Sequence, residues 1–183
     1  ATFLNNMGAK IKGAGTNVIT ITGVDYLHKS FHEVIPDRIE ASTYFIMAAA
    51  IGDGISVHGC CSEHCKETLK ILRNMGCNIK EHKYKYDGQE QSIIEISDGA
   101  IRKKLKSPGV IIADAYPSFP TDGQSLILPL LAVAKGETYV IDKIFPKRFK
   151  AAEELIKTGA KIKYTDFGIH ITGRNHLKGN IMY

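Results

Sequence analysis

The chain has no tryptophan, 4 cysteines among 183 residues, and no apolar run near the ~20 residues that a membrane-spanning helix needs. The missing apolar run argues against a transmembrane helix and against a membrane partner. Three of the cysteines, Cys60, Cys61 and Cys65, stand too close together for a disulfide framework, which favours a reducing, cytoplasmic compartment. No linker rich in proline, serine or glycine interrupts the chain, so we expect one compact body.

The amount of charge excludes little but narrows the choice of ligand. The chain is 44% hydrophobic and carries 24 basic and 19 acidic residues, a net charge of +5. This excess suits an anionic small ligand, whereas the basic residues are too scattered to favour a nucleic-acid partner. Residues 102–106 (RKKLK) hold the densest basic stretch and no aromatic residue, so we interpret them as a solvated surface.

Internal repetition is the strongest pattern in the sequence. A heptapeptide with glycine at its third position occurs as NMGAKIK (6–12), NMGCNIK (74–80) and KTGAKIK (157–163). Each copy follows a helical pattern and precedes two alternating, strand-like runs, the second of which covers residues 18–22, 92–96 and 168–172. We expect the glycine to end the helix and the two runs to form a hairpin.

A second repeat interlocks with the first. Pro36 and Pro120 each precede an apolar helix, 37–51 and 122–134, and a glycine stands 16 residues after each proline. These helices are apolar almost all round, so they should lie buried under sheets, with a kink or local bend at Pro129.

Helices expected at 63–75 and 149–158 are amphipathic and should lie outside. The repeating unit is therefore strand, helix, strand, helix, strand, strand. The chain holds two such βαβαββ units, 31–99 and 100–183, after the tail of a preceding one, 1–30. The predicted class is α/β (α+β), an inside-out, barrel-like domain with buried central helices and outer mixed sheets.

Four motifs in order, spread over nearly the whole chain, carry a family resemblance. They are FLNNMGAKIKGAGT, VIPDRIEASTYFIMAAAI, AYPSFPTDGQ and IFPKRFK. Together they resemble the UDP-N-acetylglucosamine 1-carboxyvinyltransferases, the enolpyruvyl transferases of cell-wall synthesis. The shikimate-pathway enolpyruvyl transferases share the architecture, but the PDRIEA and FPTD runs favour the UDP-sugar enzyme.

The resemblance implies two lobes of three repeats each, with the active site between them. This chain matches the end of one lobe and two repeats of the other, so the third repeat is expected to be absent. The family's catalytic cysteine loop also falls outside the matched residues. We therefore expect a fragment that is inactive alone and can self-associate through the face where the third repeat would pack.

The implied reaction moves the enolpyruvyl group of phosphoenolpyruvate onto UDP-N-acetylglucosamine and releases phosphate, the first committed step of peptidoglycan synthesis. The family mechanism is addition to the protonated double bond followed by elimination. It requires no metal and no organic cofactor. Two alternatives stay open: a shikimate-type transferase, and a non-catalytic module of the same repeats that binds RNA or another partner.

Asp122 is the expected catalytic residue. As a plain capping or first-turn acid it would be held by the helix dipole. The resemblance implies that its carboxylate also binds substrate, orienting or deprotonating the attacking sugar hydroxyl within ~3 Å. Both roles are compatible, because the dipole would keep the carboxylate ionised.

Three further residues are expected to bind substrate. Arg148 is either a solvated residue in the first turn of an outer helix or a clamp for an anionic ligand, since a guanidinium binds carboxylate and phosphate in bidentate fashion. Ile144 corresponds to a backbone contact with the UDP-sugar in the resembled family. Arg38 either belongs to a charge cluster with Asp37 and Glu40 at the helix start or lines the cleft.

Two other motifs are interpreted as structural. The run 58–65 (HGCCSEHC) could suggest zinc, but only Cys77 follows it, so we expect a helix start capped by Ser62 with buried thiols. Residues 13–16 (GAGT) lack the following helix that a phosphate-binding loop requires, and we interpret them as a hairpin turn.

Overall fold

The computed structural model describes residues 1–51, 54–86, 88–97 and 105–181. The chain divides into two compact units, Ala1–Ile35 and Pro36–Tyr183. The single body expected from the missing linker signal is therefore wrong. Residues 24–35, which end the first unit, form no helix or strand although they are not enriched in proline, glycine or serine.

The first unit is a short helix followed by a hairpin. Helix α1 (Thr2–Asn6) precedes strands β1 (Lys10–Lys12) and β2 (Thr20–Thr22), which pair antiparallel. The Asn5 side chain both donates to the carbonyl and accepts from the N–H of Ile11, at 2.8 Å each. Gly13 has φ +75°, and a Cβ there would lie 2.2 Å from the Val18 carbonyl oxygen. The hairpin turn predicted at 13–16 is confirmed.

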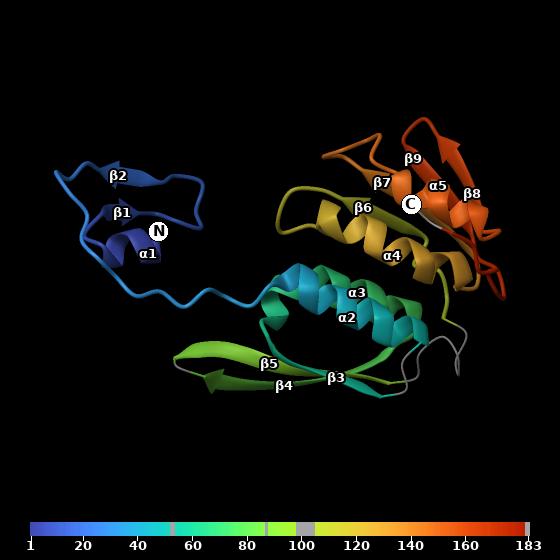
Figure 1. Cartoon of the computed structure of the whole chain (residues 1–183), viewed down its shortest axis with the longest axis horizontal. Coiled ribbons are helices and arrows are strands. Elements are labelled where there is room, and N and C mark those ends of the chain that lie inside the picture. The colour runs from blue at the N-terminus through green and yellow to red at the C-terminus, as the bar shows by residue number, and fades with distance from the viewer. Residues whose placement is uncertain (52–53, 87, 98–104, 182–183) are drawn as a thin grey trace. The chain divides into compact units, whose positions relative to one another are not determined.

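The second unit contains two runs of elements (Figure 1). The first run is α2 (Arg38–Ile51), β3 (Ile55–Cys60), the 3-10 helix η1 (Ser62–Cys65), α3 (Lys66–Met75), β4 (Asn78–Tyr86) and β5 (Gln89–Ser97). The second run is β6 (Val110–Ala113), α4 (Thr121–Val133), β7 (Glu137–Asp142), α5 (Lys150–Lys157), β8 (Lys161–Thr165) and β9 (Gly168–Thr172). The second run has the predicted order of strands and helices. The first has it from α2 onward, and residues 31–37 before α2 form no strand.

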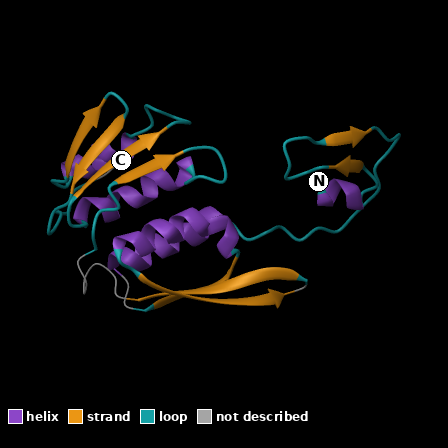
Figure 2. Cartoon of the chain, turned by 180° about the vertical axis from the view of Figure 1, so that it is seen from behind, coloured by secondary structure: helices purple, strands orange, loops and turns teal. Residues whose placement is uncertain are grey.

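Each run contributes one sheet. Strands β3, β5 and β4 are antiparallel, in the order β3-β5-β4. The other sheet has the order β6-β7-β9-β8 and is mixed, because β6 and β7 are parallel and the remaining pairs antiparallel. Helices lie between the two sheets (Figure 2). The predicted α/β class with inner helices is confirmed. The outer sheets were both expected to be mixed, but only the four-stranded one is; no strand precedes α2 in the first run, so β3 has no parallel neighbour there. Among the described strands each sheet is open.

The core centres on α2 and α4, which pack against each other. Phe45 and Ala49 of α2 and Ile127 and Leu130 of α4 have no exposed surface. Alanine at this contact lets the two helices approach closely, which strengthens dispersion contacts. The prediction that these apolar helices are buried is confirmed for the faces that meet, and α4 runs through Pro129 without a break.

One face of α2 remains open to solvent. Tyr44, Met47 and Ile51 project from it and are 46%, 39% and 63% exposed. Their spacing of three and four residues places them along one side of the helix. We call these three residues the open face of α2.

Glycines end the amphipathic helices as predicted. Gly76 closes α3 in the left-handed conformation with φ +102°, and Gly159 follows α5 with φ +87°.

Helix α4 differs: it stops at Val133, and Ala134 after it is extended. Gly136, the glycine predicted to end it, lies in the link to β7 with φ +112°. Gly52, predicted to end α2, lies outside the described residues.

Helices α3 and α5 each bury one face, as their amphipathic patterns predict. Leu69 and Leu72 of α3 and Ala152 of α5 are buried, while Lys70 is exposed. Of the basic stretch 102–106 only Leu105 and Lys106 are described, and Leu105 is buried. No helix in the described ranges combines the length and apolar character needed to cross a membrane.

Candidate active site

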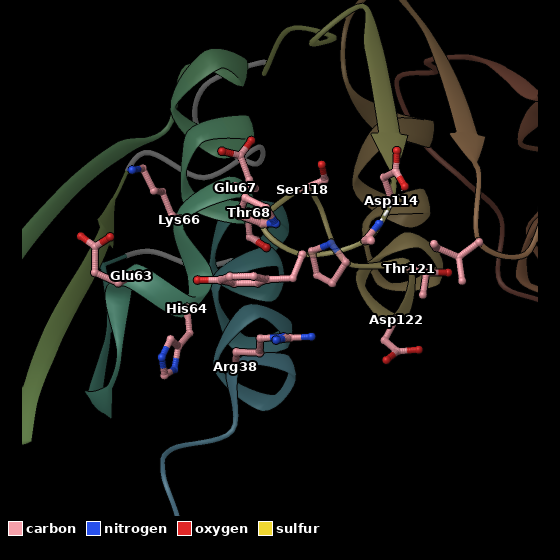
Figure 3. Close-up of a pocket in the computed structure, with 15 residues that line it drawn as sticks. Arg38, Glu63, His64, Lys66, Glu67, Thr68, Asp114, Ser118, Thr121 and Asp122 are labelled. Carbon is pink, nitrogen blue, oxygen red and sulfur yellow. Dashed lines mark hydrogen bonds between the residues drawn. The ribbon is translucent and has the colours of Figure 1, made fainter. Parts of the chain in front are cut away.

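The second unit contains a pocket of about 420 Å³. It is bounded by the first residues of α2, by η1 and the start of α3, by the loop 114–120, by the start of α4 and by the segment after β7 (Figure 3). Arg38, Asp122 and Ile144, three of the four residues predicted to bind substrate, are among those that line it. Two helix starts and one loop, far apart in sequence, thus bring these three residues to one place.

Asp122 lies in the first turn of α4. The residue before the helix is Pro120, in an extended conformation, so Asp122 is a first-turn acid and not the capping residue. Its side chain is 59% exposed, and its Oδ1 lies 3.3 Å from Nη2 of Arg148. The helix dipole favours a negative charge at this position. The carboxylate is therefore open to a ligand in the pocket while one of its oxygens contacts a cation.

The start of α4 is packed tightly against the loop that leads into it. Phe119 is buried, and the N–H of Asp114 donates to its carbonyl at 3.1 Å. A Cβ on Gly123 would lie 2.9 Å from the Phe119 ring, so glycine is required for this approach. Asp122 therefore projects from a rigid support.

Arg148 is held beside Asp122 by the start of α4. Its Nη2 donates to the carbonyl and to the hydroxyl of Thr121 at 2.8 Å each, and its guanidinium lies 4.5 Å from the centre of the Phe145 ring. It precedes α5, so the expected place in that helix's first turn is wrong. Among the described residues, Nη1 and Nε have no hydrogen-bond partner. Arg148 is not a lining residue, but it contacts two of them.

A buried carboxylate is hydrogen-bonded to Thr121 and to the 144–145 backbone. Asp142 ends β7 with 1% of its surface exposed. Its Oδ1 accepts from the N–H groups of Ile144 at 2.9 Å and Phe145 at 2.8 Å, and its Oδ2 accepts from the hydroxyl of Thr121. Because the N–H of Ile144 is occupied, a ligand contact through that backbone must use the carbonyl.

Arg38 reaches the pocket from the first turn of α2. Asp37 accepts from the N–H groups of Ile39 at 2.7 Å and Glu40 at 3.4 Å, and so caps that helix. Within the described part of the chain the Arg38 guanidinium forms no ion pair with Asp37 or Glu40. Figure 3 shows it extending toward the side of the pocket where Asp122 lies. The charge cluster expected at this helix start is therefore not formed.

The loop after β6 supplies another carboxylate to the pocket lining. Asp114 accepts from Lys143 Nζ at 3.0 Å and from the N–H of Ala115 at 2.8 Å. These hydrogen bonds, Lys143 first, lower the pKa of Asp114 from its ordinary value. Asp114 is thus paired with Lys143, and its side chain is 33% exposed against 59% for that of Asp122. Among the described residues Asp122 has one cationic contact, the longer one with Arg148 at 3.3 Å.

Sequence reasoning missed Thr121 and Asp142. Neither residue belongs to the set expected to bind substrate or to act in catalysis. The available signal was an acid at the end of the apolar strand TYVID, because polar residues at strand ends commonly face a site. That signal does not say which loops meet there.

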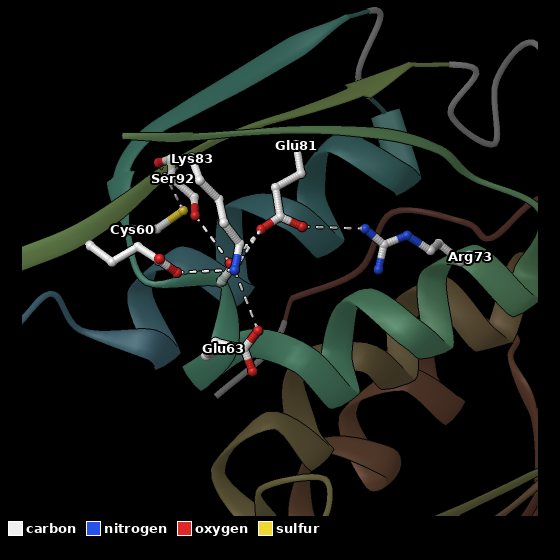
Figure 4. Close-up of polar contacts among 8 residues, drawn as sticks. Cys60, Glu63, Arg73, Glu81, Lys83 and Ser92 are labelled. Atoms are coloured by element: carbon white, nitrogen blue, oxygen red, sulfur yellow. Dashed lines mark hydrogen bonds and ion pairs between the residues drawn. The ribbon is translucent and has the colours of Figure 1, made fainter. Parts of the chain in front are cut away.

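The cysteine cluster has a structural environment. Burial raises the pKa of the Cys60 thiol, and raises that of Cys65 to about 11. Ser62 does not cap a helix: its hydroxyl donates to Glu81 at 2.6 Å and accepts from Ser92 at 3.0 Å. Figure 4 labels these two partners. The predicted cap is wrong, whereas the buried thiols are confirmed for Cys60 and Cys65. The described residues include no group of three or more side chains that could hold a metal ion.

Comparison with known proteins identifies the family of this chain. The family model of EPSP synthase (3-phosphoshikimate 1-carboxyvinyltransferase) matches residues 1–182. The chain belongs to the EPSP synthase family. The enolpyruvyl transferase resemblance carried by the four motifs is confirmed.

Within the EPSP synthase family the chain is similar to enzymes that act on a UDP-sugar. It is 45% identical over 181 residues to the UDP-N-acetylglucosamine 1-carboxyvinyltransferase of Lactobacillus johnsonii. It is 41% identical over 180 residues to UDP-N-acetylglucosamine 1-carboxyvinyltransferase 2 of Lactococcus lactis. Each match covers 98% of this chain and 40% of the relative. The chain thus spans about 40% of the length of these relatives.

Two solved structures share the fold. The enolpyruvyl transferase NikO of Streptomyces tendae superposes with a TM-score of 0.69 at 24% identity, over 92% of this chain and 38% of that protein. An EPSP synthase of Acinetobacter baumannii superposes with a TM-score of 0.63 at 21% identity, over 96% of this chain and 40% of that one.

Proposed function

We propose that this chain is part of an enolpyruvyl transferase that moves the enolpyruvyl group of phosphoenolpyruvate onto a hydroxyl of UDP-N-acetylglucosamine and releases phosphate. The observation that carries the proposal is 41–45% identity, over 98% of the chain, to enzymes named for that transfer. The division into a tail, 1–30, and two repeats, 31–99 and 100–183, belongs to this proposal. So does its cellular setting, a step of peptidoglycan synthesis in the cytoplasm.

Asp122 handles the hydroxyl proton in this proposal. The sugar oxygen forms a bond to C2 of phosphoenolpyruvate while a proton adds to C3, which gives a tetrahedral intermediate. Loss of phosphate and of a proton from the new methyl group then restores the double bond. An exposed carboxylate on a packed helix start can orient the hydroxyl and accept its proton.

The anionic groups of the substrates require cations. Arg38 lines the pocket, and its guanidinium has no hydrogen-bond or ion-pair partner among the described residues. Among the same residues Nη1 and Nε of Arg148 have no hydrogen-bond partner. A guanidinium binds phosphate or carboxylate through two parallel hydrogen bonds. We assign Arg148 to holding the anionic partner, Arg38 to the same pocket, and the Ile144 carbonyl to the UDP-sugar.

A shikimate-type transferase is the second candidate, because the matching family model is named for that enzyme. The two differ in the acceptor: UDP-N-acetylglucosamine in one, shikimate 3-phosphate in the other. The test is phosphate release by the complete protein that contains this chain, with phosphoenolpyruvate and each acceptor in turn. Turnover with shikimate 3-phosphate alone would reject the UDP-sugar proposal, and no turnover with either would favour a binding module.

The role of Asp122 is tested in the same assay. Asp122→Asn keeps the shape of the side chain but removes its basicity, so we expect turnover to fall by about 10²-fold or more while the circular dichroism spectrum is unchanged. Asp166→Asn, in the exposed turn between β8 and β9, is the matched control and should keep full activity. Full activity of Asp122→Asn would overturn the assignment.

A further inference from the structure

We propose that Asp142 is the positioning residue of this site: it fixes the start of α4, the 144–145 backbone and, through Thr121, the guanidinium of Arg148. The inference rests on the proposed function. Asp142 is buried and is not among the residues that line the pocket. Its effect on a substrate must therefore pass through the residues it holds.

The hydrogen bonds form a continuous chain. Oδ1 of Asp142 accepts the two successive backbone N–H groups of Ile144 and Phe145, and Oδ2 accepts the hydroxyl of Thr121. The Thr121 hydroxyl oxygen in turn accepts from Nη2 of Arg148 at 2.8 Å. One carboxylate thus connects the helix start that carries Asp122 with two points of the segment between β7 and α5, the 144–145 backbone and the guanidinium of Arg148.

Only a carboxylate satisfies all of these donors. Each of its oxygens accepts, whereas an amide offers one accepting oxygen and one donating nitrogen. In Asp142→Asn the oxygen can still serve the two N–H groups. The amide nitrogen would then face the Thr121 hydroxyl, whose hydrogen loses its acceptor, and the orientation of that hydroxyl toward Arg148 is no longer fixed.

The strand that carries Asp142 is itself held in place. Ala113 of β6 is its parallel neighbour in the register, and the N–H of Lys143 donates to the Ala113 carbonyl at 3.0 Å. Lys143 also pairs with Asp114 at the start of the next loop. The carboxylate therefore projects from a fixed point in the sheet, which is what a support for reacting groups requires.

The test uses the complete protein and separates kcat from KM for both substrates. We expect Asp142→Asn to lower kcat by roughly 10- to 100-fold, the size of loss that follows removal of the hydrogen-bonded partners that orient metal ligands. Thr121→Val should give a similar loss, and Thr121→Ser, which keeps the hydroxyl, should restore kcat to within a few-fold of the native value. Asp166→Asn is again the control.

A double variant decides between positioning and general destabilisation. If Asp142 acts through Thr121, the loss in Asp142→Asn/Thr121→Val is no greater than the larger single loss, because both remove the same link. Multiplying losses would overturn the proposal, as would native kcat in Asp142→Asn. If Asp142→Asn fails to fold, the Thr121→Val and Thr121→Ser pair decides: equal kcat values reject the link. An inactive native protein would instead reject the proposed function, and this inference with it.

Discussion

Arg148 and Thr121, 27 positions apart in the chain, are joined twice: one nitrogen of the guanidinium lies 2.8 Å from both the carbonyl and the hydroxyl of the threonine. The hydrogen bonds of the arginine thus use a single nitrogen, and its guanidinium carbon lies 4.5 Å from the centre of the Phe145 ring. Among the described residues, Nη1 and Nε of the guanidinium keep no hydrogen-bond partner.

Replacing Arg148 by lysine tests whether the site needs the planar guanidinium or only its positive charge. Arg148→Lys keeps the charge but loses the planar group that contacts Thr121, Asp122 and Phe145 together. We expect kcat/KM for phosphoenolpyruvate to fall at least about tenfold in the complete protein, measured by initial rates of phosphate release. Lys147→Gln, at the neighbouring exposed position, should change it less than twofold. Native kcat/KM in Arg148→Lys would show that charge alone suffices.

Gly173 should be intolerant of any side chain. A Cβ there would lie 1.5 Å from the Ala134 carbonyl oxygen and 2.7 Å from its carbon, so backbone would have to move. We expect Gly173→Ala to lower the free energy of unfolding by about 3 kcal/mol or more, measured by urea denaturation. Gly179→Ala is the control, since nothing lies within 4 Å of its Cβ position. A loss below about 1 kcal/mol would contradict the close contact with Ala134.

The buried thiols should resist alkylation. With a pKa of about 11, roughly one in 10³ of the Cys65 thiols is ionised at pH 8, and the group is 2% exposed. Iodoacetamide should therefore modify the less buried Cys61 first, and Cys65 only after denaturation, as read by peptide mass spectrometry. Rapid native labelling of Cys65 would contradict this environment.

The same raised pKa gives a dependence of stability on pH. Above the ordinary thiol value of 9.0 the unfolded chain loses the Cys65 proton first, while the folded chain keeps it until about 11. Stability from this group is complete below pH 9 and declines as pH rises from there to 11. Urea unfolding at pH 8 and pH 10 should show a smaller decline for Cys65→Ala than for the native chain.

Self-association is expected to use the open face of α2. Met47→Asp places a charge among Tyr44 and Ile51 and should shift the 183-residue chain toward monomer in analytical ultracentrifugation. Lys70→Glu, on the exposed side of α3, should leave the distribution unchanged. Equal association in both variants would assign the contact to another surface.

Local sequence patterns predicted the helices well and the contacts poorly. Helices α2 and α4 could be predicted because their apolar residues and preceding prolines are local signals, and Gly76 because a left-handed helix end favours glycine. Ser62 could not, since its partner Glu81 lies 19 positions away and tertiary structure alone brings them together. A capping serine and a cross-linking serine look the same in sequence.

For the candidate site too, the sequence predicted residues that take part but not the contacts between them. Arg38, Asp122 and Ile144 were proposed from family motifs, and the fold brings them to one pocket. The link from Asp142 through Thr121 to Arg148 depends on β7 ending beside the start of α4, a relation that no periodicity in the sequence encodes. Sequence therefore gave the identity of the groups that face the pocket, and the structure adds what holds them.

The contact between α2 and α4 makes the two halves of the second unit one cooperative folding unit. Phe45 and Ala49 from one half and Ile127 and Leu130 from the other would all become exposed if the halves separated. Neither half would keep a complete core, so we expect unfolding as a single transition. A ligand that touches Arg38 of the first half and Asp122 of the second would then raise the melting temperature of both halves together.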